Sequence, residues 1–166
     1  MKWLMSEALG YTNEIRLNLA DKYNEASVEV NVKNYAAWSK VNELGFLNRA
    51  QVGGVLAKSK VGLVTFHPLP NHIDAQPNKM FEYMSAGLPI ITSNFPLWRE
   101  IVEGNECGLC VNPLNPKAIG EAIQYLIDNP AQAERMGGNG RKAVESKFNW
   151  PVEEKKLLDL YKGLKK

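Results

Sequence analysis

Apolar segments of strand length alternate along this chain with segments of helical periodicity. The most apolar of them is "VGLVTF" at 61–66, as expected for a strand buried on both faces of a parallel sheet. Shorter strands are predicted at 14–20, 40–45, 88–93 and 107–111. Strands that alternate with helices of about ten or more residues indicate a parallel sheet covered by helices on both faces. We therefore predict one Rossmann-like α/β domain over residues 1–166, with a helical C-terminal tail.

Capping residues and apolar spacing predict where the helices lie. Asn48 and Asn78 are predicted N-caps, and Asn115 precedes a proline at the first helical position. The helix after Asn115 has apolar residues at i, i+3, i+4 and i+7, namely Ile119, Ala122, Ile123 and Leu126. Helices are predicted at 2–10, 49–59, 79–86, 96–103, 115–129, 130–148 and 150–166. The segment 23–38 fits a helix or a strand, and we favour a helix.

Glycines interrupt two of these helical segments. Gly53 and Gly54 weaken the helix after Asn48 and suggest that another group packs closely there. The "GGNG" at 137–140 is not placed between a strand and a helix, so it predicts a loop rather than a dinucleotide-binding turn. The chain also contains no Walker A sequence.

Composition excludes several classes of protein. The net charge of +2 is too small for a nucleic-acid-binding domain with a concentrated basic face. No apolar run is long enough to span a membrane, and the first residues do not form a signal peptide. We expect a cytoplasmic location. The lysines after residue 154 indicate a solvated helix face, with contact to a membrane surface left open.

Two cysteines and two histidines are the candidate reactive or metal-binding groups. Cys107 and Cys110 form "CGLC" at the start of a predicted strand, so we predict two buried, unreactive thiols rather than a redox pair. His67 and His72 flank a proline-bearing loop without a carboxylate or cysteine at useful spacing. No metal site is predicted.

The segment "HIDAQPNKMFEYMSAGLPII" carries the strongest chemical signal. With Asn78 as N-cap, Lys79 and Glu82 would lie on one face together with Tyr83, and Met80 on the core face with Phe81 and Met84. The free N–H groups of a helix start can bind phosphate, and a lysine beside them adds positive charge. A glutamate can accept hydrogen bonds from the two hydroxyls of a ribose. The alternative is an ordinary i, i+3 surface ion pair.

Longer motifs resemble one enzyme family. "DAQPNKMFEYMSAGLPIITS", the later "GLCVNPLNPKAIGEAI" and the earlier "ELGFLNRAQVGGVLAKSKVGLV" are similar, in order and spacing, to the C-terminal domain of retaining GT-B glycosyltransferases of family 4, the glycogen-synthase-like group. The resemblance extends from Ile15 to the C-terminus and is specific as a set. It implies half of a GT-B fold that binds a nucleotide-sugar donor.

The resemblance implies roles for two acids eight positions apart. Glu82 corresponds to the acid that holds the donor ribose, and Asp74 to the acid that contacts the donor sugar. These two are the candidate catalytic residues. The family usually has glutamate at the first position, so Asp74 departs from it by one methylene.

The resemblance also implies the remaining donor contacts. The diphosphate would lie near the backbone of Pro77, Asn78, Lys79 and Met80. The base would lie against the turn at Phe46 and Leu47. The implied substrate is a nucleotide diphosphate sugar, and neither a cofactor nor a metal is expected.

The implied function is donor binding for an enzyme that transfers a sugar with retention to a glycan or lipid-linked acceptor, in polysaccharide biosynthesis. The family's opening strand, with its basic phosphate-contacting pair, is not visible before "KWLMSEAL". We expect that strand and the N-terminal acceptor domain to lie outside this sequence, and the isolated chain to be inactive. Two alternatives remain, a nucleotide-sugar epimerase of the same fold and a non-catalytic α/β interaction domain.

Overall fold

Five short parallel strands form two sheets in this computed structural model, which describes residues 7–12, 15–20 and 26–164. The strands are β1 (Leu17–Leu19), β2 (Val41–Glu43), β3 (Gly62–Val64), β4 (Ile90–Ser93) and β5 (Gly108–Val111). β1 pairs with β2, and β4 lies between β3 and β5. Every predicted strand is confirmed. One continuous sheet was predicted, but among the described residues β1 and β3 are not hydrogen-bonded neighbours.

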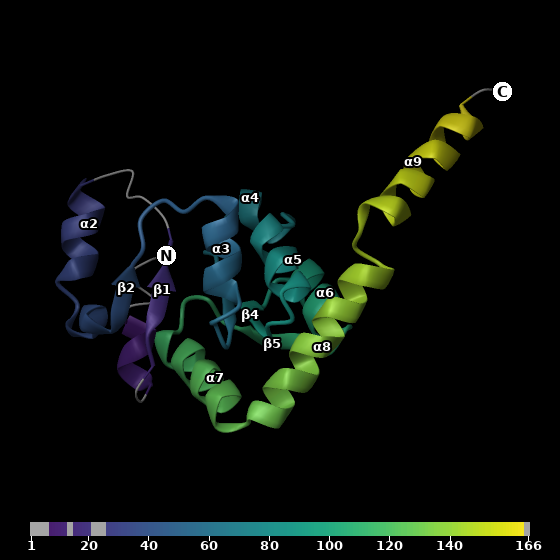
Figure 1. The fold of residues 1–166 in the computed structure, drawn as a ribbon. Coiled ribbons are helices and arrows are strands. Elements are labelled where there is room, and N and C mark those ends of the chain that lie inside the picture. The colour runs from purple at the N-terminus through teal and green to yellow at the C-terminus, as the bar shows by residue number, and fades with distance from the viewer. Residues whose placement is uncertain (1–6, 13–14, 21–25, 165–166) are drawn as a thin grey trace.

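Helices connect the strands and follow the last of them (Figure 1). They are α2 (Ala26–Lys33), α3 (Arg49–Leu56), α4 (Pro70–Ile73), α5 (Asn78–Ser85), α6 (Pro96–Val102), α7 (Pro116–Asp128), α8 (Pro130–Ser146) and α9 (Trp150–Gly163), with 3₁₀ turns η1 (Leu9–Tyr11) and η2 (Ala36–Lys40). The helix favoured for 23–38 is confirmed over Ala26–Lys33, and the 3₁₀ turn η2 covers the end of that segment. Of the helix predicted at 2–10, residues 2–6 lie outside the described residues.

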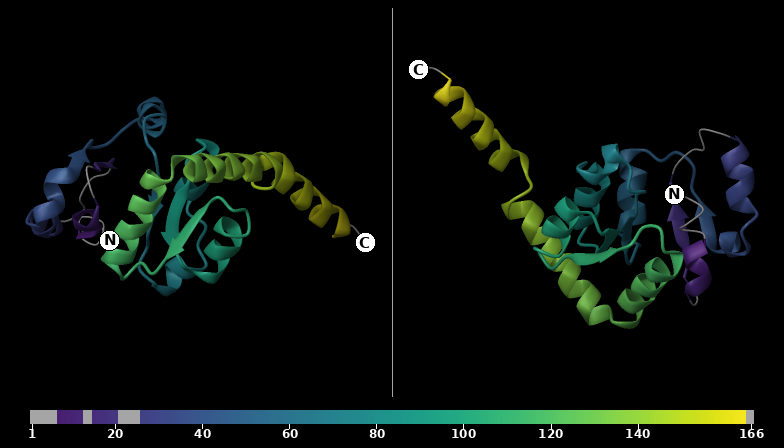
Figure 2. Two further views of the ribbon diagram at one scale, coloured as in Figure 1. Left: turned by 90° about the horizontal axis from the view of Figure 1, so that it is seen from below. Right: turned by 180° about the vertical axis from the view of Figure 1, so that it is seen from behind.

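The three-stranded sheet has helices on both faces, as predicted (Figure 2). On one face, β3 and β4 pack with α5, α6 and α8 around the buried residues Met80, Met84 and Trp98. On the other face, α7 packs its predicted apolar stripe against Ile91. Ile90 and Ile91 are both fully buried but belong to different clusters, because successive side chains of a strand point to opposite faces.

The predicted caps are confirmed at two of three helix starts. The Asn48 side chain accepts from the Gln51 N–H while the Gln51 side chain accepts from the Asn48 N–H, which is a capping box. Asn115 accepts from the N–H of Ala118 at 3.1 Å. At α5 the prediction was wrong, because Pro77 is the N-cap and Asn78 is the first helical residue. No side chain caps that helix.

The glycine predictions were also wrong. The "GGNG" segment is not a loop but part of the continuous helix α8. Gly137 allows close packing there, because a Cβ at this position would lie 2.0 Å from the carbonyl oxygen of Gly87. At Gly53 and Gly54 of α3, a Cβ would meet no described atom within 4 Å, so no described residue packs closely against them.

Helix α9 projects away from the rest of the molecule (Figures 1 and 2). None of its described residues is buried. Its apolar side chains are exposed, including Leu160 at 61% and, at the C-cap, Leu164 at 70%. The helical C-terminal tail is therefore confirmed, and its apolar face has no partner in the part of the chain that the structure describes.

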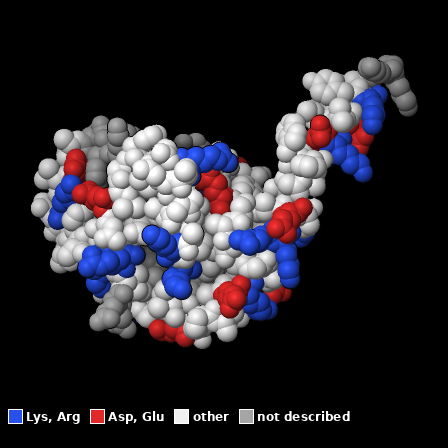
Figure 3. Space-filling view, viewed as in Figure 1, with Lys and Arg blue, Asp and Glu red and all other residues white. Residues whose placement is uncertain are grey.

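Charges are mixed over the surface seen in Figure 3, where acidic and basic side chains alternate without one large patch of either sign. This distribution agrees with the small net charge. Within residues 7–12, 15–20 and 26–164, every helix is too short or too polar to cross a lipid bilayer.

Candidate functional site

The β3–α5 loop, residues 65–77, starts where β3 ends at the carboxyl edge of the three-stranded sheet. The register pairs Val64 with Thr92 and Ser93 with Val111, so β3, β4 and β5 end at the same edge. Ligands of open α/β sheets bind outside this edge. The loop includes the short helix α4 and leads into α5. Asp74 lies on this loop, and Glu82 lies on α5.

Asp74 and Glu82 are both exposed. Asp74 is the C-cap residue of α4, and Glu82 lies one turn into α5. Neither carboxylate has a hydrogen-bond or ion-pair partner among the described residues. Both carboxylates are therefore available to accept hydrogen bonds from a ligand.

Lys79 does not pair with Glu82 in the described structure. Its ammonium nitrogen lies 4.6 Å from the centroid of the Phe66 ring, over the ring face. Attraction between a cation and an aromatic face holds it there, at the start of the loop. The i, i+3 ion pair that was the alternative explanation for this motif is therefore not formed.

The other side chains of α5 are only partly distributed between the core and the Glu82 face as predicted. Met80 and Met84 enter the core as expected. Tyr83 was expected to share the face of Glu82, but it packs against β3, where a Cβ on Gly62 would lie 2.4 Å from its ring. Burial raises the pKa of the Tyr83 phenol. The neighbouring Glu82 charge raises this pKa further.

The backbone at the start of α5 is only partly available for an anion. Pro77 has no N–H group, and the N–H of Met80 donates to the carbonyl oxygen of Pro77 at 2.9 Å. Asn78 is exposed and its side chain does not cap the helix. An anion at this helix start would therefore meet the N–H groups of Asn78 and Lys79 before that of Met80.

Phe46 and Leu47 lie in the turn between β2 and α3. Gly45, just before them, has φ +65°, which turns the chain sharply away from the strand. The Phe46 side chain is 78% exposed and Leu47 is half-buried. An exposed ring of this size beyond the carboxyl end of a strand offers a flat apolar surface.

The histidines and cysteines do not form a metal site. Among the described residues, no group of three or more histidine, cysteine and acidic side chains is arranged to hold a metal ion. Partial burial lowers the pKa of His67, and His72 contacts the His67 carbonyl oxygen at 3.0 Å through Nδ1. Burial raises the pKa of Cys107 and of Cys110 to about 11. These raised pKa values agree with the prediction that both thiols are unreactive.

Thr65 is a residue that the sequence did not single out. It directly follows β3, is 3% exposed, and its hydroxyl has no hydrogen-bond partner among the described residues. A buried hydroxyl without a partner is unfavourable. In sequence it is a threonine at the end of an apolar strand-like run, and no local pattern marks its hydroxyl as unsatisfied.

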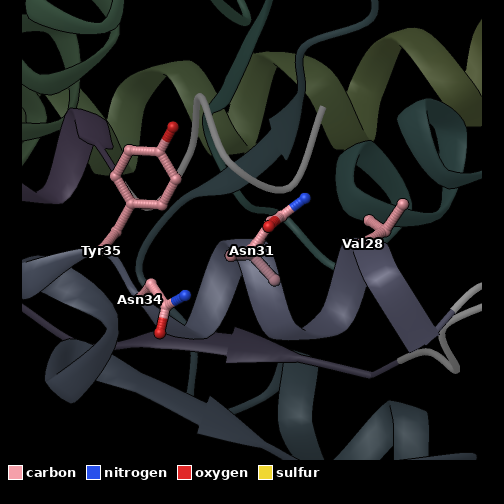
Figure 4. A pocket seen from close by; sticks show the side chains of 5 residues that line it. Val28, Asn31, Asn34 and Tyr35 are labelled. Carbon is pink, nitrogen blue, oxygen red and sulfur yellow. The ribbon is translucent and has the colours of Figure 1, made fainter.

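A pocket of about 530 Å³ lies elsewhere, on α2 (Figure 4). Val28, Asn31, Val32, Asn34 and Tyr35 line it. Figures 1 and 2 place α2 on the far side of the β1–β2 pair from α5. This pocket is therefore separate from the candidate site.

Comparisons with known proteins agree with this fold. The chain is 38% identical to spore coat protein SA of Bacillus subtilis over 82 residues, which is 49% of this chain and 22% of that protein. It is 34% identical to the capsular polysaccharide biosynthesis glycosyltransferase CapM of Staphylococcus aureus over 92 residues, 55% of this chain and 24% of the relative. The chain thus spans less than a quarter of the length of these curated relatives.

Among solved structures, Anabaena HepE in complex with UDP matches with a TM-score of 0.82 and 16% identity, covering 98% of this chain and 46% of that one. At this identity the match shows the Rossmann-like fold alone. The family profile described as "Glycosyl transferases group 1" matches residues 6–143. That range includes all five strands, the β3–α5 loop and both candidate acids. The chain therefore belongs to the glycosyl transferases group 1 family.

Proposed function

We propose that this chain is the nucleotide-sugar-binding C-terminal domain of a retaining GT-B glycosyltransferase of family 4. The observation that carries the proposal is the state of Glu82 and Asp74. Both carboxylates are exposed at the carboxyl edge of the sheet and have no partner among the described residues. Glu82 would accept hydrogen bonds from the donor ribose, and Asp74 would contact the donor sugar.

The proposed donor lies along the loop and the start of α5. Its diphosphate would meet the uncapped helix start and Lys79, and its base would lie against Phe46 and Leu47. As the sugar–phosphate bond breaks, negative charge grows on the leaving diphosphate. Oriented N–H groups and a lysine ammonium stabilise that charge more than they stabilise the bound donor, and this difference accelerates the reaction. The new bond forms on the same face of the sugar.

The acceptor side of the proposal involves a second domain. Among the described residues, β1 and β3 each have one edge without a strand partner, which leaves room for a further parallel strand. The apolar face of α9 is likewise uncovered. Both features support a larger protein in which an N-terminal domain binds the acceptor. The spore-coat and capsule relatives support a glycan or lipid-linked acceptor in polysaccharide biosynthesis.

Calorimetric titration of the chain with UDP and with GDP tests donor binding. We expect one of the two to bind, because the base contacts should prefer one nucleotide. If neither nucleotide binds to the chain or to a longer protein that contains it, the donor-binding proposal is wrong and an interaction domain is favoured. With full-length protein and donor alone, conversion of the sugar would instead identify an epimerase.

Glu82→Ala tests the ribose contact. We expect it to weaken nucleotide binding by about 1–3 kcal/mol, the range for hydrogen bonds to charged groups. The matched control is Glu121→Ala on α7, where the carboxylate forms an exposed pair with Lys117 at 3.7 Å and its loss should leave binding unchanged. Equal affinities of wild type and Glu82→Ala would remove Glu82 from the site.

The isolated chain should bind the donor without transferring sugar, because the acceptor would be held by the other domain. A turnover assay with donor and candidate acceptors measures this directly. Sugar transfer by the isolated chain would contradict the division of roles between the two domains.

A further inference from the structure

Two side chains from neighbouring elements hold the β3–α5 loop at its two ends. At the start of the loop, the hydroxyl of Ser93 accepts from the N–H of Phe66 at 2.7 Å and donates to its carbonyl oxygen at 2.8 Å. Ser93 is the last residue of β4 and is fully buried. At the end of the loop, the indole N–H of Trp98, on α6, donates to the carbonyl oxygen of Ala75 at 2.6 Å.

The contact made by Trp98 reaches the loop from the core. The Trp98 side chain is fully buried, and its ring centroid lies 4.9 Å from that of Phe95 and 5.6 Å from that of Phe66. These packed rings fix the direction of the indole N–H. A buried indole N–H requires an acceptor, and here the acceptor is a loop carbonyl rather than a group within α6.

Ala75 lies between the candidate acid Asp74 and the start of α5. It directly follows Asp74, and two residues later Pro77 is the N-cap of α5. Its own N–H donates to the His72 carbonyl oxygen at 3.2 Å. Fixing the Ala75 carbonyl therefore restricts the backbone on both sides, toward the exposed Asp74 carboxylate and toward the uncapped helix start.

We infer that Trp98 is a positioning residue of the candidate site, whose indole N–H holds the β3–α5 loop in the shape that presents Asp74 and the first turn of α5. The inference rests on the proposed function for the identity of the ligand. Its structural part, the control of loop shape by one hydrogen bond, stands on the observed contacts alone. A loop held in its binding shape before the ligand arrives loses less conformational freedom on binding.

The first experiment needs no ligand. The indole N–H of Trp98 should exchange with solvent far more slowly than that of Trp150, which is 66% exposed, when both are followed by NMR in the wild-type chain. Trp98→Phe keeps an aromatic ring and removes the N–H. We expect hydrogen exchange of residues 67–77 to accelerate about tenfold in this variant. Ile123→Ala is the control, because Ile123 is buried in the other cluster.

The control separates loop shape from general stability. Ile123→Ala should lower the thermal midpoint without accelerating exchange in the loop beyond its effect on the whole domain. Equal acceleration of the loop in both variants would overturn the inference, since Trp98 would then be an ordinary core residue. An indole N–H of Trp98 that exchanges as fast as that of Trp150 would overturn it without any variant.

The second experiment measures binding of UDP and GDP at a temperature where both variants are folded. We expect Trp98→Phe to raise the Kd of the nucleotide that binds about tenfold, and Ile123→Ala to change it less than about twofold. Unchanged affinity in Trp98→Phe would overturn the positioning role. If wild type binds neither nucleotide while the loop still loosens in Trp98→Phe, the proposed function fails and the control of loop shape remains.

Discussion

At the scale of single residues, the environment of a side chain decides its role more than its spacing does. Lys79 and Glu82 are three positions apart on α5, where a surface ion pair is common. The structure instead places the Lys79 ammonium over the Phe66 ring and leaves Glu82 exposed. The sequence could not predict this, because the position of Phe66 depends on how the end of β3 packs against α5.

Thr65 supplies a prediction at this scale. Its hydroxyl is buried without a described partner, so Thr65→Val should raise the free energy of unfolding of the chain by about 1 kcal/mol. Thr92→Val is the matched control, because the Thr92 hydroxyl forms a hydrogen bond with the Cys110 sulfur at 3.3 Å. Loss of this hydrogen bond should destabilise the chain. Urea unfolding of the two variants gives both values.

Equal losses of stability in the two variants would contradict this expectation. If Thr65→Val destabilises the chain as much as Thr92→Val does, the Thr65 hydroxyl has a partner in solution.

At the scale of elements, the sequence predicted strands and amphipathic helices well and predicted exceptions poorly. The strand at 61–66 and the stripe of α7 follow from local periodicity, and each is confirmed. The cap of α5 was misplaced by one residue because proline, which lacks a capping side chain, occupies the N-cap. The "GGNG" segment was predicted as a loop because it is not placed between a strand and a helix, yet it is helical.

The helical "GGNG" has a tertiary explanation. Gly137 lies against the carbonyl oxygen of Gly87, the residue with φ +72° that ends α5. The N–H of Leu88 then donates to the Tyr83 carbonyl oxygen at 3.0 Å, as in a Schellman motif. Close contact between α8 and this turn selects glycine at position 137, and no local pattern in the sequence reveals such a contact.

Two glycine variants test this account. Gly137→Ala should lower the free energy of unfolding by about 2–3 kcal/mol, because the new methyl group forces α8 away from the turn at Gly87. Gly138→Ala, one residue on, meets no described atom within 4 Å and should raise it by up to about 1 kcal/mol through helix propensity. Chemical denaturation measures both, and a similar sign for the two variants would contradict the packing argument.

At the scale of the whole molecule, the packed α/β body ends near Phe148. The Phe148 ring lies 5.3 Å from the Phe81 ring and packs against the cluster of α5 and α6. The chain then enters α9, in which no residue is buried. The stability of the α/β body should therefore not depend on the helical tail.

Removal of residues 150–166 should leave the thermal midpoint nearly unchanged and reduce concentration-dependent association, because it removes the exposed leucines of α9. Phe148→Ala should instead destabilise the body by about 2 kcal/mol through lost aromatic packing. Calorimetry and light scattering measure the two effects. A large drop in midpoint on truncation would show that α9 packs against the body in solution.

The projection of α9 also has a mechanical consequence. Its 14 residues form a rod of about 21 Å at 1.5 Å per residue. A rotation of about 10° at its base, where the Asn149 side chain accepts from the Val152 N–H at 3.1 Å, would move the far end by about 4 Å over that length. A small change in backbone torsion at Asn149 would therefore displace the tip of α9 by about the size of a side chain.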